Sequence, residues 1–149
     1  MIQKIFRMMV SHEGKDSSNA ISFGLLVFRV AIGCFMLFGH GLSKLTGYSQ
    51  MSAGFPDPLG IGNPAVSMAL SIFAEFLMSI ALIFGFLTRF ALIPLIINMS
   101  VALIFIHKAD PFNVKELAFM YLIAYVALII TGPGRYSLDA LIVKLTRKK

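Results

Sequence analysis

The sequence contains one cysteine, Cys34, and few charged residues of either sign. A single cysteine excludes a disulfide framework and a CxxC redox pair within this chain. Charged residues account for 13% of the 149 residues and hydrophobic residues for 58%, a balance well outside the averages of soluble globular proteins. Because so little polar sequence leaves no room for a soluble domain, we expect any chemistry to lie within a membrane bundle, at its faces or on a partner protein.

The sequence also lacks an internal repeat and a tight metal-ligand motif such as HxxxH or HExxH. It has no soluble basic module that could present a groove-sized surface to nucleic acid. The net charge of +6 therefore indicates membrane topology and attraction to lipid headgroups. We expect the lipid bilayer as a partner, we expect no nucleic acid, and we assign no metal site.

Four apolar stretches are long enough to cross a hydrocarbon core about 30 Å thick. They occupy about residues 22–45, 64–86, 90–107 and 115–131. The tight segment GFLTR between the second and third stretches makes these two spans antiparallel neighbours. The sequence thus predicts an all-α fold, an integral membrane four-helix bundle in which residues 1–149 form a single domain.

Short amphipathic helices are predicted in the membrane interface at both ends of the bundle. The N-terminal MIQKIFRMMV has apolar residues at helical spacing, and Lys4 and Arg7 interrupt the apolar core that a secretory signal would need. Near the C-terminus, the segment at about 137–147 follows the helix-stopping GPG and places basic residues beside a leucine-rich face. We expect Ser137 to cap this surface helix and Asp139 to complement its positive end.

The basic residues near the span ends predict the orientation, because Lys and Arg accumulate on the cytoplasmic side. If the N-terminus is cytoplasmic, nine basic residues fall on that side and three on the other, with Arg29 inside the membrane. The nine are Lys4, Arg7, Lys15, Arg89, Arg135, Lys144, Arg147, Lys148 and Lys149. The three are Lys44, Lys108 and Lys115. We therefore expect a multi-pass protein with both termini in the cytoplasm.

Ionisable side chains inside the first two spans form polar stripes. Arg29, His40 and Lys44 stay on one side of the first helix, and Glu75 lies near the middle of a serine-flanked stripe in the second. An ionised side chain near the bilayer centre costs about 2.5 to 3.5 kcal/mol, so these groups should face protein or water. A rise of about 1.5 Å per residue places Arg29 roughly 10 Å deep and Glu75 roughly 16 Å deep.

We therefore predict an Arg29–Glu75 pair between the first two spans, because each charge alone costs more in lipid than both together. Two interpretations of this pair stay open. The pair either fixes only the registry of the helices, or it keeps a carboxylate ready for proton transfer or for holding a polar ligand.

At the outer end of the bundle, His40, Lys44, His107 and Glu116 are expected at similar depth. Three arrangements are open: hydrogen-bonded packing at the interface, a divalent metal held by the histidines and Glu116, or a small polar ligand held by Lys44 and the histidines. The Gly- and Pro-rich loop GYSQMSAGFPDPLGIGNP is long enough to close over such a ligand.

Other polar or aromatic residues within the spans have structural explanations. Asn98, one turn after Pro94, is expected to serve the backbone group that this proline frees. Tyr121 and Tyr125 lie four residues apart and could flank a planar quinone, but aromatic residues at that spacing favour a place in the core.

Three stretches stand out as a set: LLVFRVAIGCFMLFGHGLSKL, AEFLMSIALIFGFLTRFA and GPGRYSLDALI. Together they resemble the successive signatures of the DoxX family of small four-span bacterial membrane proteins, over about Gly24 to Ile142. The resemblance implies a location in the bacterial inner membrane. It maps the recurring polar positions of the family onto Arg29, His40, Lys44, Glu75, His107 and Glu116.

The resemblance also implies a function. The family takes its name from a subunit associated with a thiosulfate:quinone oxidoreductase, and other members are linked to membrane redox complexes. A quinone-linked redox subunit or accessory is therefore expected, with quinone as the candidate cofactor, a membrane or peripheral redox protein as the candidate partner, and Glu75 with His40 or His107 handling protons. More distant relatives act as assembly factors or cargo receptors. The alternative is accordingly a non-catalytic assembly or binding protein whose polar residues only hold the bundle. In either case Gly24, Gly33 and Gly39 favour association into a homo-oligomer.

Overall fold

The computed structural model describes residues 19–147 of the chain. Within that range every regular element is a helix. Four helical stretches are long and apolar enough to cross a membrane: Asn19–Thr46, Pro64–Phe84, Thr88–Ile106 and Phe112–Thr131. The predicted all-α, four-span architecture is therefore confirmed, whereas the predicted N-terminal interfacial helix falls outside the described residues.

π-Helical segments interrupt the first two spans and end the third. The first span consists of α2 (Asn19–Met36), π-helical η1 (Leu37–Gly41) and α3 (Leu42–Thr46). The second consists of α5 (Pro64–Ile72), π-helical η3 (Phe73–Met78) and α6 (Ser79–Phe84). The third consists of α7 (Thr88–Val101) and π-helical η4 (Ala102–Ile106). The fourth is the single α-helix α8 (Phe112–Thr131), and α9 (Leu138–Thr146) follows it. Between the first two spans lie α4 (Tyr48–Met51) and the 3-10 turn η2 (Ser52–Gly54).

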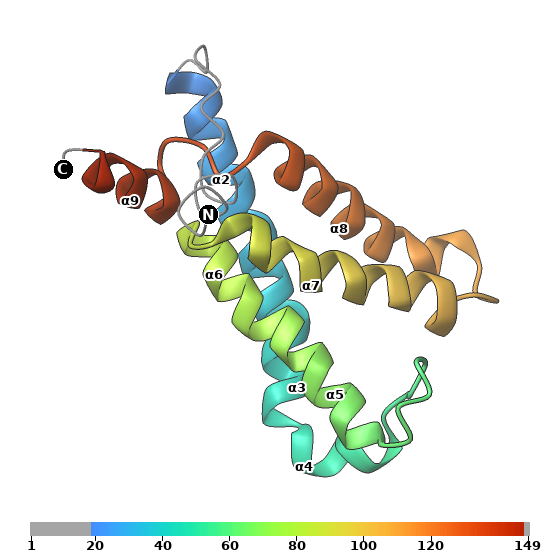
Figure 1. The fold of residues 1–149 in the computed structure, drawn as a ribbon. Coiled ribbons are helices and arrows are strands. Elements are labelled where there is room, and N and C mark those ends of the chain that lie inside the picture. Colours follow the sequence, from blue (N-terminus) through green and yellow to red (C-terminus); the bar gives the residue numbers. More distant parts are fainter. Residues whose placement is uncertain (1–18, 148–149) are drawn as a thin grey trace.

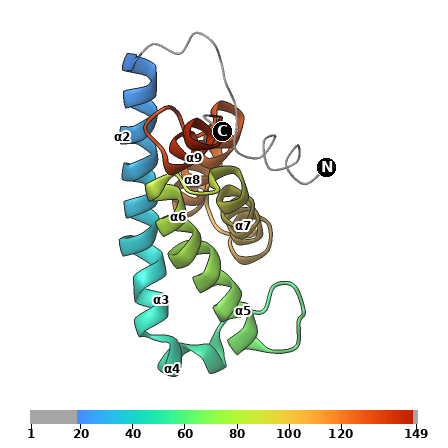
Figure 2. The same cartoon turned by 60° about the vertical axis from the view of Figure 1, so that its left-hand side comes forward.

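The spans form two antiparallel hairpins that cross at a steep angle. Figure 1 shows the first and second spans running side by side, while α7 and α8 run together across them. In Figure 2, α7 and α8 are viewed almost along their axes, whereas α2 extends along the page. α2 packs against α6, and α7 packs against both α8 and η3. The second hairpin therefore meets the first at the middle of the second span.

Local sequence signals set both ends of the second span. The side chain of Asn63 accepts hydrogen bonds from the backbone N–H groups of Ala65 and Val66, and Pro64 occupies the first turn of α5. At the other end α6 stops at Gly85, whose φ of 66° lies in the left-handed region that glycine adopts without strain. The polar and glycine residues at these positions therefore fix the length of the span.

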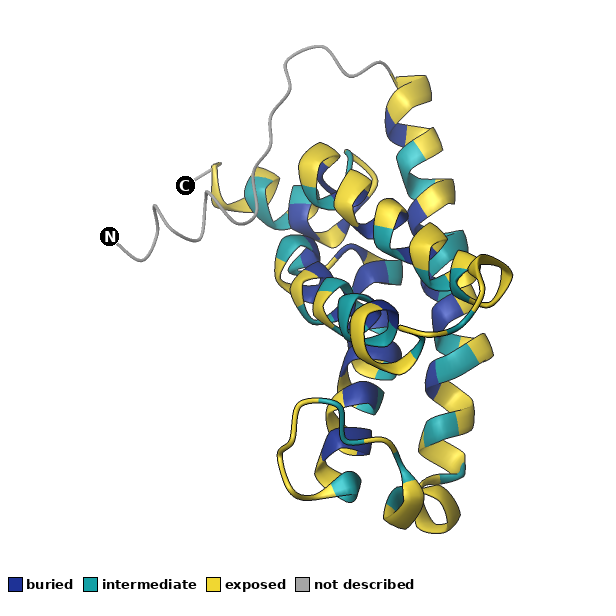
Figure 3. Ribbon diagram, turned by 90° about the vertical axis from the view of Figure 1, so that its right-hand side faces the viewer, coloured by how far each residue is buried: buried dark blue, intermediate teal, exposed yellow. Residues whose placement is uncertain are grey.

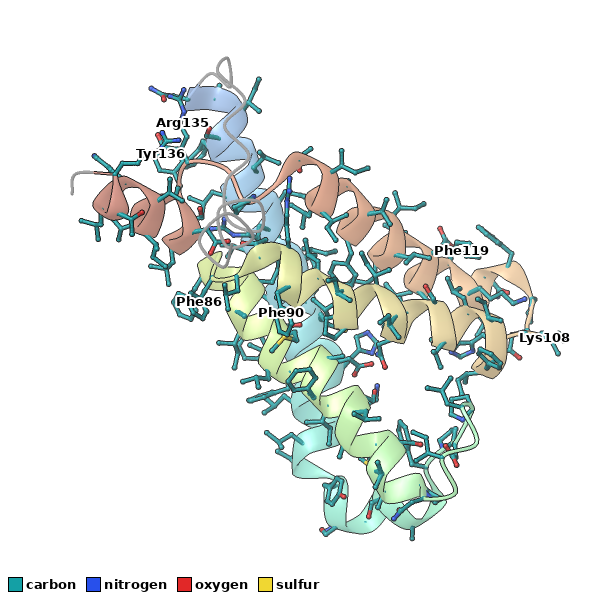
Figure 4. All side chains as sticks on the ribbon, viewed as in Figure 1. Phe86, Phe90, Lys108, Phe119, Arg135 and Tyr136 are labelled. Atoms are coloured by element: carbon teal, nitrogen blue, oxygen red, sulfur yellow. The ribbon has the colours of Figure 1, made fainter. Side chains whose placement is uncertain are left out.

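Buried residues lie on the parts of the helices that are turned toward one another, and exposed residues lie on the outward parts of the ribbon (Figure 3). The core includes Met36, Leu82, Leu92, Leu95, Tyr125 and Leu128. Large apolar side chains cover the outer faces, and Figure 4 shows Phe86, Phe90 and Phe119 among them. A continuous apolar exterior of this kind fits contact with lipid tails rather than with water.

Arg29 joins the first span to the segment that follows the fourth. The residue is only 1% exposed, and its guanidinium donates from Nη1 to the carbonyl of Pro133 at 2.6 Å and from Nη2 to the carbonyl of Tyr136 at 2.8 Å. Both carbonyls lie beyond the end of α8, so no following helical N–H group is available to them. Arg29 therefore stabilises an irregular backbone segment against the end of the bundle.

Asp139 joins α9 to the start of the third span. Its carboxylate accepts hydrogen bonds from the backbone N–H groups of Leu87 at 2.7 Å and Thr88 at 2.9 Å, and from the Thr88 hydroxyl at 2.8 Å. Asp139 lies in the first turn of α9, as predicted, and it additionally caps the start of α7, which the sequence did not predict. Ser137 caps α9 as expected, accepting from the backbone N–H of Ala140.

Gly85 lies between these two interactions. A Cβ atom at this position would lie 2.6 Å from Nη1 of Arg29 and 2.6 Å from Cβ of Ser137, and the Gly85 carbonyl accepts from the backbone N–H of Asp139 at 2.9 Å. We call this group of contacts around Arg29, Gly85 and Asp139 the Arg29–Asp139 junction. It fastens the first span, the turn between the second and third spans, and α9 to one another.

Asp139→Ala should lower the free energy of unfolding by about 2 to 4 kcal/mol, because it leaves one buried and one partly buried backbone N–H group and a buried hydroxyl without their charged acceptor. Asp139→Asn keeps one side-chain carbonyl acceptor and should lower the free energy of unfolding by less than Asp139→Ala does. Thermal unfolding of purified protein in detergent measures both. Lys144→Ala on the exposed side of the same helix serves as the control and should stay within about 0.5 kcal/mol of wild type. Equal stability of Asp139→Ala and wild type would contradict the junction.

Candidate functional site

A buried carboxylate lies at the centre of the polar interior. Both carboxylate oxygens of Glu75, on η3, lie 2.5 Å from Nζ of Lys44 on α3. Asn98 on α7 donates from Nδ2 to Oε1 of Glu75 at 2.8 Å. Ser71, one turn earlier on α5, accepts from Lys44 at 3.2 Å and donates to Oε1 of Glu75 at 3.4 Å. We call Lys44, Ser71, Glu75 and Asn98 the Glu75 cluster, to which three spans contribute.

The Glu75 cluster adjoins a close backbone contact between the first two spans. A Cβ atom at Gly41 would lie 2.6 Å from the carbonyl oxygen of Glu75 and 2.8 Å from the backbone nitrogen of Phe76. Only glycine fits this position without a shift of the neighbouring backbone. The contact joins the π-helical segments η1 and η3, and π-helical turns are rare features that often mark functional sites.

His40 and two tyrosines border the Glu75 cluster. The His40 ring meets the ring of Tyr121 edge-on with centroids 5.8 Å apart, and Tyr121 stacks on Tyr125 at 5.9 Å. Both tyrosines belong to the buried core, as the sequence favoured, and both lie within electrostatic range of Glu75. The hydroxyl of Tyr125 is buried and has no hydrogen-bond partner among the described residues. The fourth span thus adds aromatic surface and phenolic hydroxyls to the site.

Loop 47–63 reaches the Glu75 cluster from one end of the bundle. The ring centroid of Phe55 lies 6.0 Å from Nζ of Lys44, at the outer limit of a cation–π contact. Lys44 is the cluster member next to this loop, and its side chain is 21% exposed, whereas that of Glu75 is 3% exposed. The loop that was expected to close over a ligand therefore places an aromatic ring at the partly exposed edge of the site.

Asp57 holds that loop in its folded form. Its carboxylate accepts hydrogen bonds from the hydroxyl of Ser67 at 2.6 Å and from the backbone N–H groups of Ile61 at 3.1 Å and Gly62 at 2.7 Å. The Ser67 hydrogen bond, and with it the two backbone bonds, lowers the pKa of Asp57 below its ordinary value of 3.8. The bond to Ser67 also fastens the loop to the first turns of α5.

The structure brings together three of the six predicted site residues. His40, Lys44 and Glu75 share the polar interior, whereas Arg29 lies in the Arg29–Asp139 junction. His107 pairs instead with Asp110, with Nδ1 2.7 Å from Oδ2, in the turn after η4, and Glu116 is exposed on α8. Among residues 19–147, no three His, Cys, Asp or Glu side chains lie where they could hold a metal ion together.

The predicted Arg29–Glu75 pair is wrong, because each residue has other partners. The irregular segment after α8 places the carbonyl oxygens of Pro133 and Tyr136 within reach of Arg29, and these acceptors engage the guanidinium. Lys44 reaches Glu75 from the opposite direction, because its flexible stem can extend its ammonium group inward from the span end. The prediction that Glu75 needs a basic partner on the first span was therefore correct, but the partner lies about four helical turns further along.

Asn98 is the site residue that sequence reasoning missed. It was interpreted as serving the backbone freed by Pro94, whereas its amide donates to Glu75. The signal that could have found it is an amide side chain in the middle of an apolar span, facing a carboxylate that needs several donors when it is buried.

The Glu75 cluster and its neighbours combine a carboxylate, an ammonium, an amide, an imidazole and phenolic hydroxyls within a lipid-shielded interior. Such a set offers donors and acceptors for a small ligand, and titratable groups for proton transfer. Ionisable residues within membrane spans mark ligand or proton pathways by default. The arrangement therefore suits a ligand that carries polar atoms on a flat apolar ring.

The sequence matches the DoxX family over residues 24–108. This chain belongs to the DoxX family. The match extends over the first three spans and includes every residue of the Glu75 cluster, while α8 and its tyrosines lie beyond it. The family assignment predicted from the three sequence signatures is therefore confirmed, and the chain is a membrane protein in contact with the lipid bilayer.

Curated relatives extend the similarity over most of the DoxX chain. An uncharacterized protein of Haemophilus influenzae is 32% identical over 128 residues, covering 81% of this chain and 84% of the relative. The inner membrane protein YqjF of Escherichia coli is 33% identical over 126 residues, covering 81% of this chain and 93% of the relative. No solved structure matches the chain.

In this DoxX protein, Lys44→Met should lower the free energy of unfolding by about 3 kcal/mol, because it leaves the Glu75 carboxylate buried without its countercharge. The double variant Lys44→Met/Glu75→Gln should recover most of this loss. Thermal unfolding in detergent measures the single variants and the double variant as a cycle. Lys108→Met, at an exposed lysine in the turn between α7 and α8, is the matched control and should leave stability unchanged. Additive losses in the double variant would show that the two residues do not act as a pair.

Acidification should release loop 47–63 at a pH set by Asp57. Because the folded-state pKa lies below the ordinary value of 3.8, the carboxylate stabilises the loop fully above that value, and this stabilisation is lost as the pH falls through the lowered pKa. The amide resonances of Ile61 and Gly62 should therefore titrate with a midpoint below 3.8 in an NMR experiment. Asp57→Asn should abolish this titration, and a midpoint above 3.8 in the wild-type protein would contradict the assignment.

Proposed function

We propose that this DoxX protein binds a small quinone-type ligand at the Glu75 cluster and serves as a subunit or accessory of a redox system in the bacterial inner membrane. The observation that carries the proposal is a buried carboxylate with donors from three spans and aromatic rings beside it. The name of the Escherichia coli relative supports the inner membrane as the location. The distribution of basic residues supports an orientation with both termini in the cytoplasm.

The residues of the site match the requirements of a quinone head group. A quinone is planar and has two carbonyl oxygens, and its reduction to a quinol takes up two electrons and two protons. Lys44 and Asn98 carry hydrogen-bond donors for a carbonyl oxygen, and the rings of His40 and Tyr121 supply flat surfaces. Glu75 and His40 are the groups that exchange protons, whereas the electrons come from the partner redox protein.

A second function is favoured by the Arg29–Asp139 junction. Arg29, one of the residues expected at the site, holds backbone segments together and contacts none of the polar interior. If the Glu75 cluster serves the same purpose, the chain is a non-catalytic assembly or binding protein. The two functions differ in whether the interior accepts a ligand.

The test is saturable binding of a short-chain quinone to the purified protein in lipid nanodiscs. A photoreactive quinone analogue, followed by mass spectrometry, locates the bound ring. We expect wild-type protein to be labelled on α8 or η1, near Tyr121 and His40. Asn98→Ala, which removes one donor and adds no charge, should weaken binding at least tenfold.

His107→Ala is the matched control, since His107 lies in the turn after η4 and pairs with Asp110. It should bind the quinone as the wild-type protein does. Absence of saturable binding in the wild-type protein would favour the assembly function. Equal weakening by His107→Ala and Asn98→Ala would place the ligand elsewhere.

A further inference from the structure

A row of polar side chains follows one face of the second span. Ser67, Ser71, Glu75 and Ser79 recur at a spacing of four residues, and each is at least nine-tenths buried. Residues four apart on a helix lie one above the other, so the row runs along the span rather than around it. The row begins near loop 47–63 and passes through the Glu75 cluster.

On the loop side of Glu75 every member of the row has a polar partner. Ser67 donates to Asp57, whose carboxylate lies in the loop and is only half-buried. Ser71 bonds to the ammonium of Lys44, which is the partly exposed member of the cluster. Polar groups thus connect Glu75 with the surface at this end of the bundle.

On the other side of Glu75 the row stops. Ser79 is 0% exposed, and its hydroxyl has no hydrogen-bond partner among the described residues. One turn beyond Ser79, Leu82 is also 0% exposed, and it belongs to an apolar core that includes Met36, Leu92, Leu95 and Leu128. The Arg29–Asp139 junction then closes the end of the bundle, where Gly85 is packed directly against the guanidinium of Arg29.

We infer that the Glu75 cluster opens to one face of the bilayer only, the face that bears loop 47–63, and that Ser67 and Ser71 line the route by which protons and small polar solutes reach Glu75. The titratable groups that interact with Glu75 are Lys44 from α3 and, electrostatically, Tyr121 and Tyr125 from α8, and His40 from η1 lies against Tyr121. The third span faces Glu75 with the neutral amide of Asn98.

This inference deepens the proposed function and rests on it, because it states which side of the membrane supplies protons to the same site. A quinone can still enter from the lipid between the helices. The protons exchanged with Glu75, however, come from and return to the loop side. In a redox reaction, this sidedness decides which compartment changes its pH.

Cysteine accessibility tests the sidedness without a ligand, so its failure leaves quinone binding to be judged by its own experiment. In a Cys34→Ala background, S71C reports the loop side of Glu75, and S79C is its matched control four residues beyond Glu75 on the same face. A charged, membrane-impermeant thiol reagent is added to either side of sealed vesicles. Q50C in the loop and K144C in α9 identify the two sides, because three spans, an odd number, separate these positions along the chain (Figure 1).

S71C should react from the Q50C side at least tenfold faster than S79C and should not react from the K144C side. The inference is overturned if S79C reacts as fast as S71C, if S71C reacts from the K144C side, or if S71C is unreactive from both sides. S67C repeats the measurement one turn closer to the loop, in case the loss of the Ser71 hydroxyl disturbs folding.

A second measurement uses the protein with its natural residues. A cationic, membrane-impermeant carbodiimide joins an amine to a neighbouring carboxylate as an amide, and the water that is lost converts the carbodiimide to its urea. Lys44 and Glu75 lie close enough for this zero-length link, which peptide mass spectrometry detects. The link between Lys44 and Glu75 should form when the reagent is on the side of the membrane that bears Gln50. Formation of the link from the side that bears Lys144, equal formation from both sides, or formation from neither side would overturn the inference.

Discussion

A carboxylate within a low-dielectric bundle has to be matched by opposite charge and by hydrogen bonds, and Glu75 imposes this requirement on three spans. Lys44 supplies the charge, Asn98 supplies a neutral donor, and the close contact at Gly41 brings the first span near enough for Lys44 to reach. The π-helical form of η1 and η3 accompanies this contact. The two hairpins also cross at Glu75. There α7 packs against η3, and Asn98 of α7 donates to the carboxylate.

Two polar centres divide the bundle into ends of different character. The Arg29–Asp139 junction uses charged side chains mainly to satisfy backbone groups. The Glu75 cluster instead pairs side chains with side chains and borders aromatic rings. Side-chain pairs can exchange partners without unfolding the backbone, whereas carbonyl groups of an irregular segment cannot. The family match includes Arg29 and the whole Glu75 cluster, whereas Asp139 and the two carbonyls that Arg29 binds lie beyond the matched residues.

The sequence was sufficient to predict the fold class, because hydrophobic length and the turn residues at Asn63 and Gly85 determine where helices can begin and end. It was also sufficient to single out Glu75 and Lys44, since charges in an apolar span stand out by residue type. The residues that pair with these charged side chains were harder to predict. Counting depth along each span assumes that the helices run nearly parallel, and the steep crossing of the hairpins breaks that assumption (Figure 2). The partners of Arg29 are backbone carbonyls, which leave no trace in residue types, and the role of Asn98 depends on that same crossing.

The bond between Arg29 and Pro133 joins residues 104 positions apart in the chain. During synthesis the first span therefore leaves the ribosome long before its guanidinium can meet its final acceptors. Until the last span has been made, Arg29 has to rely on water, headgroups or the insertion machinery to satisfy its charge. The bundle is therefore complete only after its C-terminal segment has been made. A chain that ends early would leave the Arg29 cation unsatisfied in the bilayer. Quality-control proteases could recognise an unfinished chain by this exposed charge.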